Sequence, residues 1–478
     1  MSEKKNNLDM PSGEFKEVGK RLIDWSADYL ENIEKYPVLS NVKPGDVKSK
    51  LPHSPPQKGE SFDQIISDLD SIIMPGVTHW QHPNFMAYFA SSASGPGILA
   101  DIISSSLNVN GMVWKSCPSV TELEQTVLIW YREMLGLPEN FKGIIYDTAS
   151  VSTLHGVACA REYAGVNIRE KGMSGAPKLR MYCTEHAHSS VDKAALMLGF
   201  GLDGIKKIPV DENFAMVPSE LEKAIAEDRA SGIVPCCVVA TVGTTSTTAV
   251  DPIDKIGEIC TKENIWFHVD CAYAGVTAML PEMKKYFAGI ENADSIVSNP
   301  HKWLFVPIDL STFYTRKPEI LKRAFSLVPE YLKSNEDSQV ENYMDYGIQL
   351  GRRFRALKLW FVIRYFGVEG LQDRIREHIR IAQRFAKWVD EDESFERMAS
   401  TPFSTICFRA KPKDFPEEKL NELNEKLLNA LNETGKIFLV HTKLNGVFTI
   451  RLVISGIRQE ERHAEEAWTL LKATLNQL

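Results

Sequence analysis

The chain has 478 residues, of which 44% are hydrophobic and 25% charged, and its formal net charge is −8. This length suffices for two or three domains with a large core, and the composition is that of a globular protein. The acidic balance and the lack of a basic stripe with interleaved aromatics argue against nucleic acid as a partner. No apolar run is long enough to span a bilayer, and no apolar stretch follows the lysines near Met1. We therefore expect a cytoplasmic protein with no membrane partner.

The eight cysteines form no C-x-x-C pair, and Cys236 and Cys237 lie in a largely apolar stretch. This usage predicts buried, reduced thiols and no disulfide framework. The pair His186 and His188 has no carboxylate or thiol at a zinc-like spacing, so we expect no metal site.

The first predicted element is an amphipathic helix over residues 13–36, with Ser12 placed to cap its start and Pro37 to end it. Its apolar residues recur at spacings of three or four: Phe15, Val18, Leu22, Trp25, Tyr29 and Ile33. Residues 38–60 are rich in Pro, Lys and Ser, which is typical of an extended connection. The apolar stripe needs a partner surface, either the body of the same chain or a second subunit.

From about residue 95 to residue 330, short apolar runs alternate with helical segments such as 219–230 and 253–262. The runs read as strands at 143–146, 180–183, 236–242, 265–269, 295–298 and 310–314. This alternation predicts an α/β domain with a mostly parallel sheet covered on both faces. Ligands of such sheets bind beyond the carboxyl ends of the strands.

The remaining residues predict a small C-terminal α+β domain. The expected elements are long helices within 350–390, a helix at 417–431, a strand at 436–440, a hairpin strand at 447–454 after a turn at 444–446, and a final helix at 459–476. The sequence thus divides into an N-terminal arm (1–94), a large domain (95–350) and a small domain (351–478).

Two motifs at predicted strand ends point to one cofactor. Asp270 lies in His268-Val269-Asp270-Cys271-Ala272, and Lys302 lies in Asn299-Pro300-His301-Lys302-Trp303. A lone lysine after a strand is usually a solvated loop residue, and a lone aspartate there more often caps a helix. Together they suit pyridoxal 5'-phosphate (PLP): the lysine amine can form a Schiff base, and the aspartate can keep the pyridine nitrogen protonated.

Further segments fit such a site. Thr148-Ala149-Ser150 precedes a helical run at 153–163, and free N–H groups at a helix start can bind a phosphate. His188 and the segment 243–245 follow other strand ends. Tyr331 precedes a polar stretch, although a lone tyrosine before a loop more often serves packing.

With these motifs the sequence resembles the group II PLP-dependent amino-acid decarboxylases, most closely the aromatic-L-amino-acid decarboxylases. The resemblance covers nearly the whole chain. It includes the motifs at 79–83, 87–89, 121–124, 187–190, 243–245 and 350–354, together with those of Asp270 and Lys302.

The resemblance implies a large domain of fold type I, the aspartate-aminotransferase-like fold, and a homodimer with shared active sites. It also implies roles for individual residues. Lys302 would carry the cofactor, Asp270 would pair with its ring nitrogen, and His188 would stack on the ring. The other implied cofactor-site residues are Thr245, Ala149, Ser150, Asn299 and His301.

On the substrate side, the resemblance places Tyr331 on a loop that closes over the substrate and makes it the proton donor or relay. The implied pocket residues are Trp80, Tyr88, Phe89, Met112, His301 and Gly351, with the segment near Met112 reaching in from the partner subunit. The chain departs from many relatives in lacking a Glu after Ser150, and from animal relatives in having Met112 where they carry Phe.

These residues favour an aromatic amino-acid decarboxylase, with tryptophan preferred because Gly351 and Met112 leave room for a large ring. Tyrosine, DOPA and phenylalanine stay open. Relatives that form aldehydes tend to have Phe at the Tyr331 position, and histidine-specific relatives tend to have Ser at the Gly351 position. An aromatic aldehyde synthase, a decarboxylase of histidine or an acidic amino acid, and a catalytically inactive protein of this fold are the alternatives.

Overall fold

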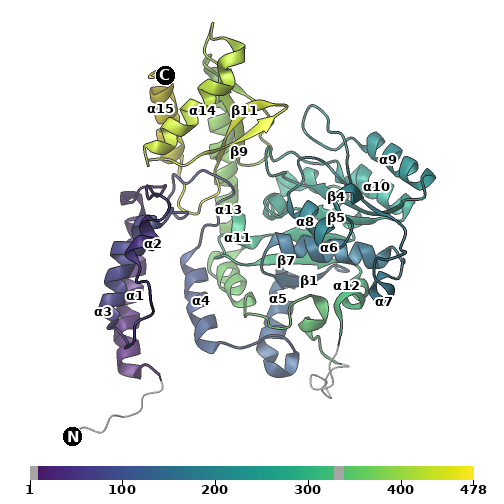
Figure 1. Cartoon of the computed structure of the whole chain (residues 1–478), viewed down its shortest axis with the longest axis horizontal. Coiled ribbons are helices and arrows are strands. Elements are labelled where there is room, and N and C mark those ends of the chain that lie inside the picture. The colour runs from purple at the N-terminus through teal and green to yellow at the C-terminus, as the bar shows by residue number, and fades with distance from the viewer. Residues whose placement is uncertain (1–8, 328–338) are drawn as a thin grey trace.

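The computed structural model describes residues 9–327 and 339–478, so the expectations for Tyr331 lie outside the described residues. The described chain forms a sheet of seven strands, a second sheet of four strands, and an N-terminal helical arm (Figure 1). Within these residues no helix is both long and apolar enough to cross a membrane.

The large sheet is mostly parallel, as the sequence predicted. Its strands are β1 (Lys142–Tyr146), β2 (Leu179–Cys183), β3 (Ile205–Lys207), β4 (Val234–Thr241), β5 (Trp266–Asp270), β6 (Ser295–Ser298) and β7 (Ser311–Thr315), in the order β1-β7-β6-β5-β4-β2-β3. The exception is β7, which pairs antiparallel with both of its neighbours, β1 and β6. The sequence analysis missed β3 because three residues, two of them lysines, carry too little periodicity to be read as a strand.

Both faces of this sheet are covered, because successive side chains of its central strands enter different hydrophobic clusters. In β4, Cys237 and Val239 pack with α6 (Ala149–Tyr163), which crosses the strands (Figure 1). Val238 and Ala240 pack on the opposite face. That face is covered by α5 (Pro118–Met134), α9 (Pro218–Ala230) and α10 (Ile253–Glu263). All eight cysteines are unpaired, and all but Cys117 are buried, as predicted.

Shorter helices connect the strands and border the sheet: α4 (Gly95–Leu107), α7 (Ile168–Lys171), α8 (Ser190–Met197), α11 (Pro300–Trp303) and α12 (Pro318–Phe325). The long helix α13 (Ala356–Glu391) then leads to the second sheet. Gly367 interrupts α13 with a φ of 67°, a backbone conformation that favours glycine. The sequence had predicted long helices here without locating this break.

The second sheet is antiparallel, in the order β10-β11-β9-β8, and packs against α13, α14 and α15. Its elements are β8 (Phe395–Arg397), β9 (Thr405–Ala410), α14 (Leu420–Glu433), β10 (Val440–Leu444), β11 (Val447–Val453) and α15 (Glu461–Leu475). The predicted turn is present, with positive φ at Asn445 and Gly446. The strand predicted at 436–440 was misplaced, because the backbone of Phe438 pairs with Asn84 and Met86 instead of with this sheet.

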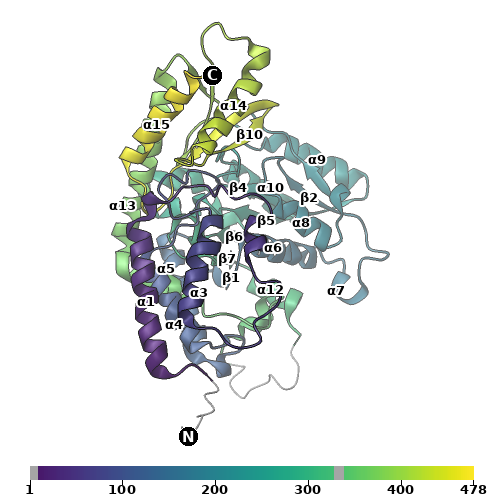
Figure 2. The ribbon, with the colours of Figure 1, turned by 60° about the vertical axis from the view of Figure 1, so that its left-hand side comes forward.

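The N-terminal arm consists of α1 (Ser12–Glu31), α2 (Asp46–Lys50) and α3 (Phe62–Asp68), and α1 runs beside α3 in both views (Figures 1 and 2). Trp25 Nε1 of α1 donates to Oδ1 of Asp70, in the helical turn that follows α3, at 3.0 Å. The predicted cap was wrong: Ser12 lies inside the helix and makes no capping bond. The helix also ends before Pro37, and α2 interrupts the segment expected to be extended.

Candidate active site

Three neighbouring strands of the large sheet bring Asp270 and Lys302 to the same edge. In the parallel register, Asp270 at the end of β5 lies opposite Thr241 of β4 and Val297 of β6. The short helix α11 begins two residues after β6 ends and carries Lys302. The structure therefore places the carboxylate and the amine at the carboxyl ends of adjacent strands, where α/β sheets bind ligands.

The buried environment of Lys302 shifts its amine toward the neutral form. Burial lowers the pKa of Lys302 below its usual value, and the negative charge of Asp270 partly opposes this shift. Its Nζ lies 5.3 Å from the centroid of the Phe89 ring. A lysine with a lowered pKa is neutral more of the time, and the neutral amine is the form that attacks a carbonyl carbon.

Asp270 is almost fully buried, with 5% of its surface exposed. Its Oδ1 accepts a hydrogen bond from the backbone N–H of Ala272 at 2.9 Å, which fixes the orientation of the carboxylate. A charged group held away from water is stabilised by an opposite charge, so this position suits a cationic ligand atom such as a protonated ring nitrogen.

His188 is held in one orientation and one tautomer. The backbone N–H of Ser190 donates to its Nδ1 at 3.2 Å, and the Ser190 hydroxyl lies 2.8 Å from the same atom. Because a backbone N–H can only donate, Nδ1 is an acceptor and the neutral ring carries its proton on Nε2. Burial and the charge of Lys302 lower the pKa of His188, while Asp270 opposes them. His188 is thus an uncharged flat ring whose pKa is affected by the charges of both Asp270 and Lys302.

The start of α6 offers backbone donors for an anion. The helix begins at Ala149, and the side chain of Thr148 at the N-cap makes no capping hydrogen bond. Ala149 and Ser150 therefore lie in the first turn, not before it as the sequence suggested, and Ser150 is exposed. First-turn N–H groups have no partner within a helix, and the helix dipole favours negative charge there. This turn can hold a phosphate.

The other predicted cofactor-site residues follow the ends of β6 and β4. His301 accepts from the backbone N–H of Leu310 at 3.0 Å, and burial, assisted by the charge of Lys302, lowers the pKa of His301 to about 4. Asn299 is buried, and its Oδ1 has no hydrogen-bond partner in the described part of the chain. A buried acceptor without a partner fits a site whose ligand supplies the donor. Thr245 is exposed, four residues beyond β4.

One of the predicted aromatic pocket residues, Phe89, lies beside Lys302, and two others, Trp80 and Tyr88, are partly exposed. Phe89 stacks on Tyr273, with 3.7 Å between the ring centroids. Trp80 and Tyr88 stack on each other at 5.8 Å and are 40% and 49% exposed. Phe89 is thus the aromatic ring beside the buried amine, while Trp80 and Tyr88 form a partly exposed stack.

Met112 and Gly351 lie on two paired segments of the chain. The backbone N–H of Gly111 donates to the carbonyl of Arg352 at 2.9 Å, which pairs the two segments. No hydrogen bond or ring contact within residues 9–327 and 339–478 joins this pair to Trp80 or Phe89. The predicted substrate wall therefore comprises, within the described residues, two groups of residues that share no hydrogen bond or ring contact.

The structure adds Arg451, which the sequence analysis missed. It lies on β11, is 5% exposed, and its guanidinium carbon is 5.4 Å from the centroid of Phe89. Its Nε donates to the carbonyl of Ser246 at 2.7 Å, whereas its Nη2 has no partner among the described residues. A buried guanidinium with a free N–H can bind a carboxylate. An arginine inside an otherwise apolar strand was the signal that could have revealed it.

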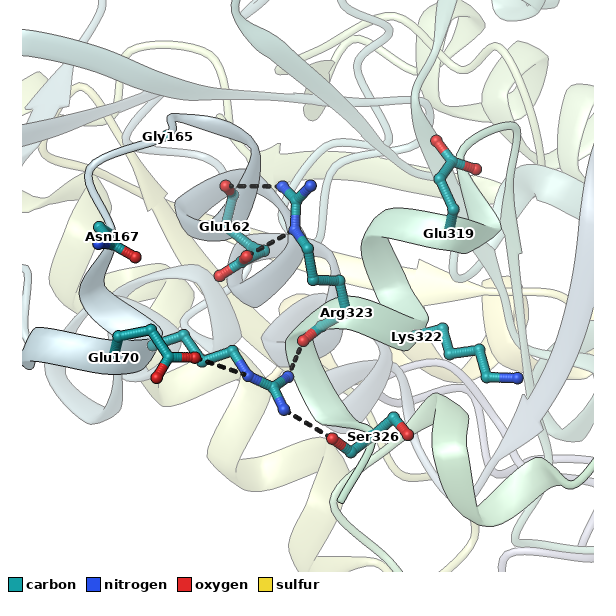
Figure 3. Close-up of a pocket in the computed structure, with 9 residues that line it drawn as sticks. Glu162, Gly165, Asn167, Glu170, Glu319, Lys322, Arg323 and Ser326 are labelled. Atoms are coloured by element: carbon teal, nitrogen blue, oxygen red, sulfur yellow. Dashed lines mark hydrogen bonds and ion pairs between the residues drawn. The ribbon is translucent and has the colours of Figure 1, made fainter. Parts of the chain in front are cut away.

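A polar hollow at α6, α7 and α12 is not part of this site (Figure 3). Its arginines are engaged within its own wall: Arg323 pairs with Glu162 at 2.6 Å, and Arg169 donates to the carbonyl of Ser326 at 2.7 Å. None of the residues predicted to bind cofactor or substrate lines it.

Comparisons with known proteins agree with this geometry. The family model described as "Pyridoxal-dependent decarboxylase conserved domain" matches residues 44–411. The chain is 41% identical to "Tyrosine decarboxylase 4" of Petroselinum crispum, covering 96% of this chain and 92% of that protein. It is 40% identical to "Phenylacetaldehyde synthase" of Arabidopsis thaliana, covering 97% and 96%. The structure of Oryza sativa TDC with PLP and tryptamine superposes with a TM-score of 0.95 at 35% identity, covering 98% and 99%.

Proposed function

Since the chain belongs to the pyridoxal-dependent decarboxylase family, amino-acid carboxy-lyases that use PLP, we propose that it converts an aromatic amino acid into its amine and CO2. The observation that carries this proposal is the ring of Phe89, whose centroid lies 5.3 Å from Nζ of Lys302, with the partly exposed stack of Trp80 and Tyr88 preceding it in the chain. Stacking on such rings favours an aromatic substrate side chain.

In this proposal the residues at the strand ends hold the cofactor. When the cofactor is bound, Lys302 would hold its aldehyde carbon covalently, Asp270 would keep its ring nitrogen protonated, and His188 would cover one face of the ring. The first-turn N–H groups at Ala149 and Ser150 would bind its phosphate. The bound cofactor supplies an electron-accepting ring that stabilises the charge left when CO2 departs.

The substrate is held from two directions. Arg451 is proposed to bind the α-carboxylate through its free Nη2, while the aromatic surface around Phe89 takes the side chain. Two fixed points set the orientation of the bond to be broken relative to the cofactor ring. The neutral His188 adds no charge that would compete with Arg451 for the carboxylate.

Tyr331→Phe is expected to retain the cofactor and to lower amine yield, with aldehyde, ammonia and peroxide formed in its place. The proposed phenol proton would be missing, so the reactive carbon would be open to oxygen. Product analysis with aldehyde trapping measures the ratio of amine to aldehyde. The 40% identity to a phenylacetaldehyde synthase makes this partition a sharp test. Unchanged amine yield with no trapped aldehyde would remove Tyr331 from the mechanism.

Tryptophan is expected to be decarboxylated with a higher kcat/KM than histidine or glutamate, and at least comparably to tyrosine. Gly351 leaves depth for a fused ring, and the flexible Met112 can move aside. Gly351→Ser should shift preference toward smaller rings by about 10- to 200-fold. A competition assay with these amino acids, DOPA and phenylalanine, with amines quantified by mass, measures the order of their kcat/KM values. Faster turnover of glutamate or histidine than of every aromatic amino acid would contradict the proposal.

We also propose a homodimer that completes each site. Exposed large apolar side chains gather in the N-terminal arm and on α4: Phe15, Ile23, Ile65, Leu99, Ile102, Ile103 and Leu107. Helices α1, α3 and α4 lie on the same side of the molecule (Figure 2). Apolar surface of this extent on a folded chain is typical of a protein interface. A dimer would bring the surface of Met112 and Gly351 from one copy to Lys302 of the other.

Removal of residues 1–36 is expected to destabilise the dimer and lower activity, because it uncovers the apolar surface that α1 covers. Light scattering at the assay concentration, together with activity, measures both effects. Removal of residues 1–8 alone, which precede α1, is the control and should change neither. A fully active monomer after the longer truncation would refute the shared site.

A further inference from the structure

Asn110 is held in a fixed orientation against the segment that carries Gly351. Its Oδ1 accepts a hydrogen bond from the backbone N–H of Arg352 at 2.9 Å. A backbone N–H can only donate, so the oxygen of the Asn110 amide must face Arg352. The Nδ2 group, which carries the two N–H donors, therefore points away from Arg352.

The Nδ2 group of Asn110 lies between Gly351 and Met112. A Cβ atom at Gly351 would be 3.7 Å from Nδ2, and the sulfur of Met112 is 3.6 Å from it. A thioether sulfur is a weak acceptor, so the donors of this amide are little used within the chain. The wall formed by these two residues thus carries a hydrogen-bond donor between two positions that offer only apolar contact.

Arg352 makes this arrangement rigid. Its side chain is buried, and its Nη2 donates to Glu124 at 2.6 Å and to the carbonyl of Ile145 at 2.8 Å. A buried, charge-assisted network of this kind fixes the backbone on which it is built. Ile145 lies on β1, four residues before Ala149 at the start of α6. The donor of Asn110 therefore has a defined place relative to the phosphate turn of its own chain.

We propose that Asn110 determines specificity by donating a hydrogen bond from Nδ2 to the ring hydroxyl of a tyrosine-type substrate. This deepens the proposed function and rests on it. Asn110 and Gly351 are both exposed in the single chain, so in the proposed homodimer the donor of one copy can face the substrate bound at Lys302 of the other. A phenol oxygen accepts this hydrogen bond, whereas phenylalanine has no oxygen and an indole N–H only donates. The space that Gly351 leaves for the substrate ring and the hydrogen-bond donor of Asn110 would then determine substrate preference separately.

The test compares kcat/KM for L-tyrosine and L-phenylalanine, whose equal ring size cancels the effect of Gly351. Wild-type enzyme is expected to favour tyrosine. Asn110→Leu is expected to lower the tyrosine-to-phenylalanine ratio by roughly three- to tenfold, the value of one uncharged hydrogen bond, while phenylalanine is still turned over. Asn140→Leu is the matched control, since it makes the same change at an exposed position outside the proposed site and should leave the ratio unchanged.

A wild-type preference for phenylalanine overturns the assignment of Asn110, and this measurement needs no variant to fold. An unchanged ratio in Asn110→Leu, or an equal fall with both substrates, also overturns it. These results would leave the decarboxylase assignment intact. Failure to turn over any aromatic amino acid would instead overturn the proposed function together with this inference.

Discussion

Lys302→Ala is expected to lower turnover by at least about a thousandfold, because the variant lacks the amine that binds the cofactor and exchanges with substrate. The described structure supports this choice of lysine on two grounds. Lys302 lies at the same sheet edge as Asp270, and burial lowers its pKa toward the neutral, nucleophilic form. Steady-state rates of amine release measure the effect.

The exposed Lys58 provides the control, since Lys58→Ala removes an amine without touching the sheet edge and should keep wild-type rates. Circular dichroism would show whether Lys302→Ala keeps its fold. A folded Lys302→Ala protein with more than a few per cent of wild-type activity would refute the role proposed for this residue.

Asp270→Asn is expected to lower kcat by roughly a hundred- to a thousandfold, the usual loss when one preorganised electrostatic partner is removed. The substitution is nearly isosteric, and an amide oxygen can still accept the hydrogen bond that Ala272 donates to Oδ1. What is lost is the negative charge that favours a protonated ring nitrogen. Single-turnover rates at saturating cofactor measure this loss separately from weakened cofactor binding.

Two results would separate a charge effect from damage to the fold. The melting temperature of Asp270→Asn should stay near that of the wild type, because the buried geometry is retained. Asp270→Glu, which keeps the charge but moves it, should lose less activity than Asp270→Asn. Equal rates for wild type and Asp270→Asn would show that this carboxylate does not act on the cofactor ring.

The large sheet could be predicted because its strands are apolar runs separated by helices of clear periodicity. The short strand β3 could not, since three residues carry no pattern, and the pairing of Phe438 with Asn84 and Met86 depends on contacts far apart in the sequence. The break in α13 at Gly367 was also not located. The division into 1–94, 95–350 and 351–478 stays a prediction.

The candidate site was predictable where chemistry lies in short motifs that end strands, as for Asp270 and Lys302. Arg451 escaped because an arginine inside a mostly apolar strand marks only an unusual position; its approach to Phe89 follows from the packing of β11 against the large domain. The orientation of the Asn110 donor could not be predicted either, because it is set by a hydrogen bond from Arg352, more than 200 residues later in the chain. The roles of all these residues remain proposals.

Borohydride reduction of the PLP-loaded protein, followed by peptide mapping, tests most directly the claim that the cofactor is bound at this sheet edge. The account predicts one stable cofactor adduct, on Lys302, and its loss in Lys302→Ala. It also predicts that the reduced protein releases no amine from tryptophan or tyrosine. An adduct on any other lysine, or full activity after reduction, would contradict the assignment of the site.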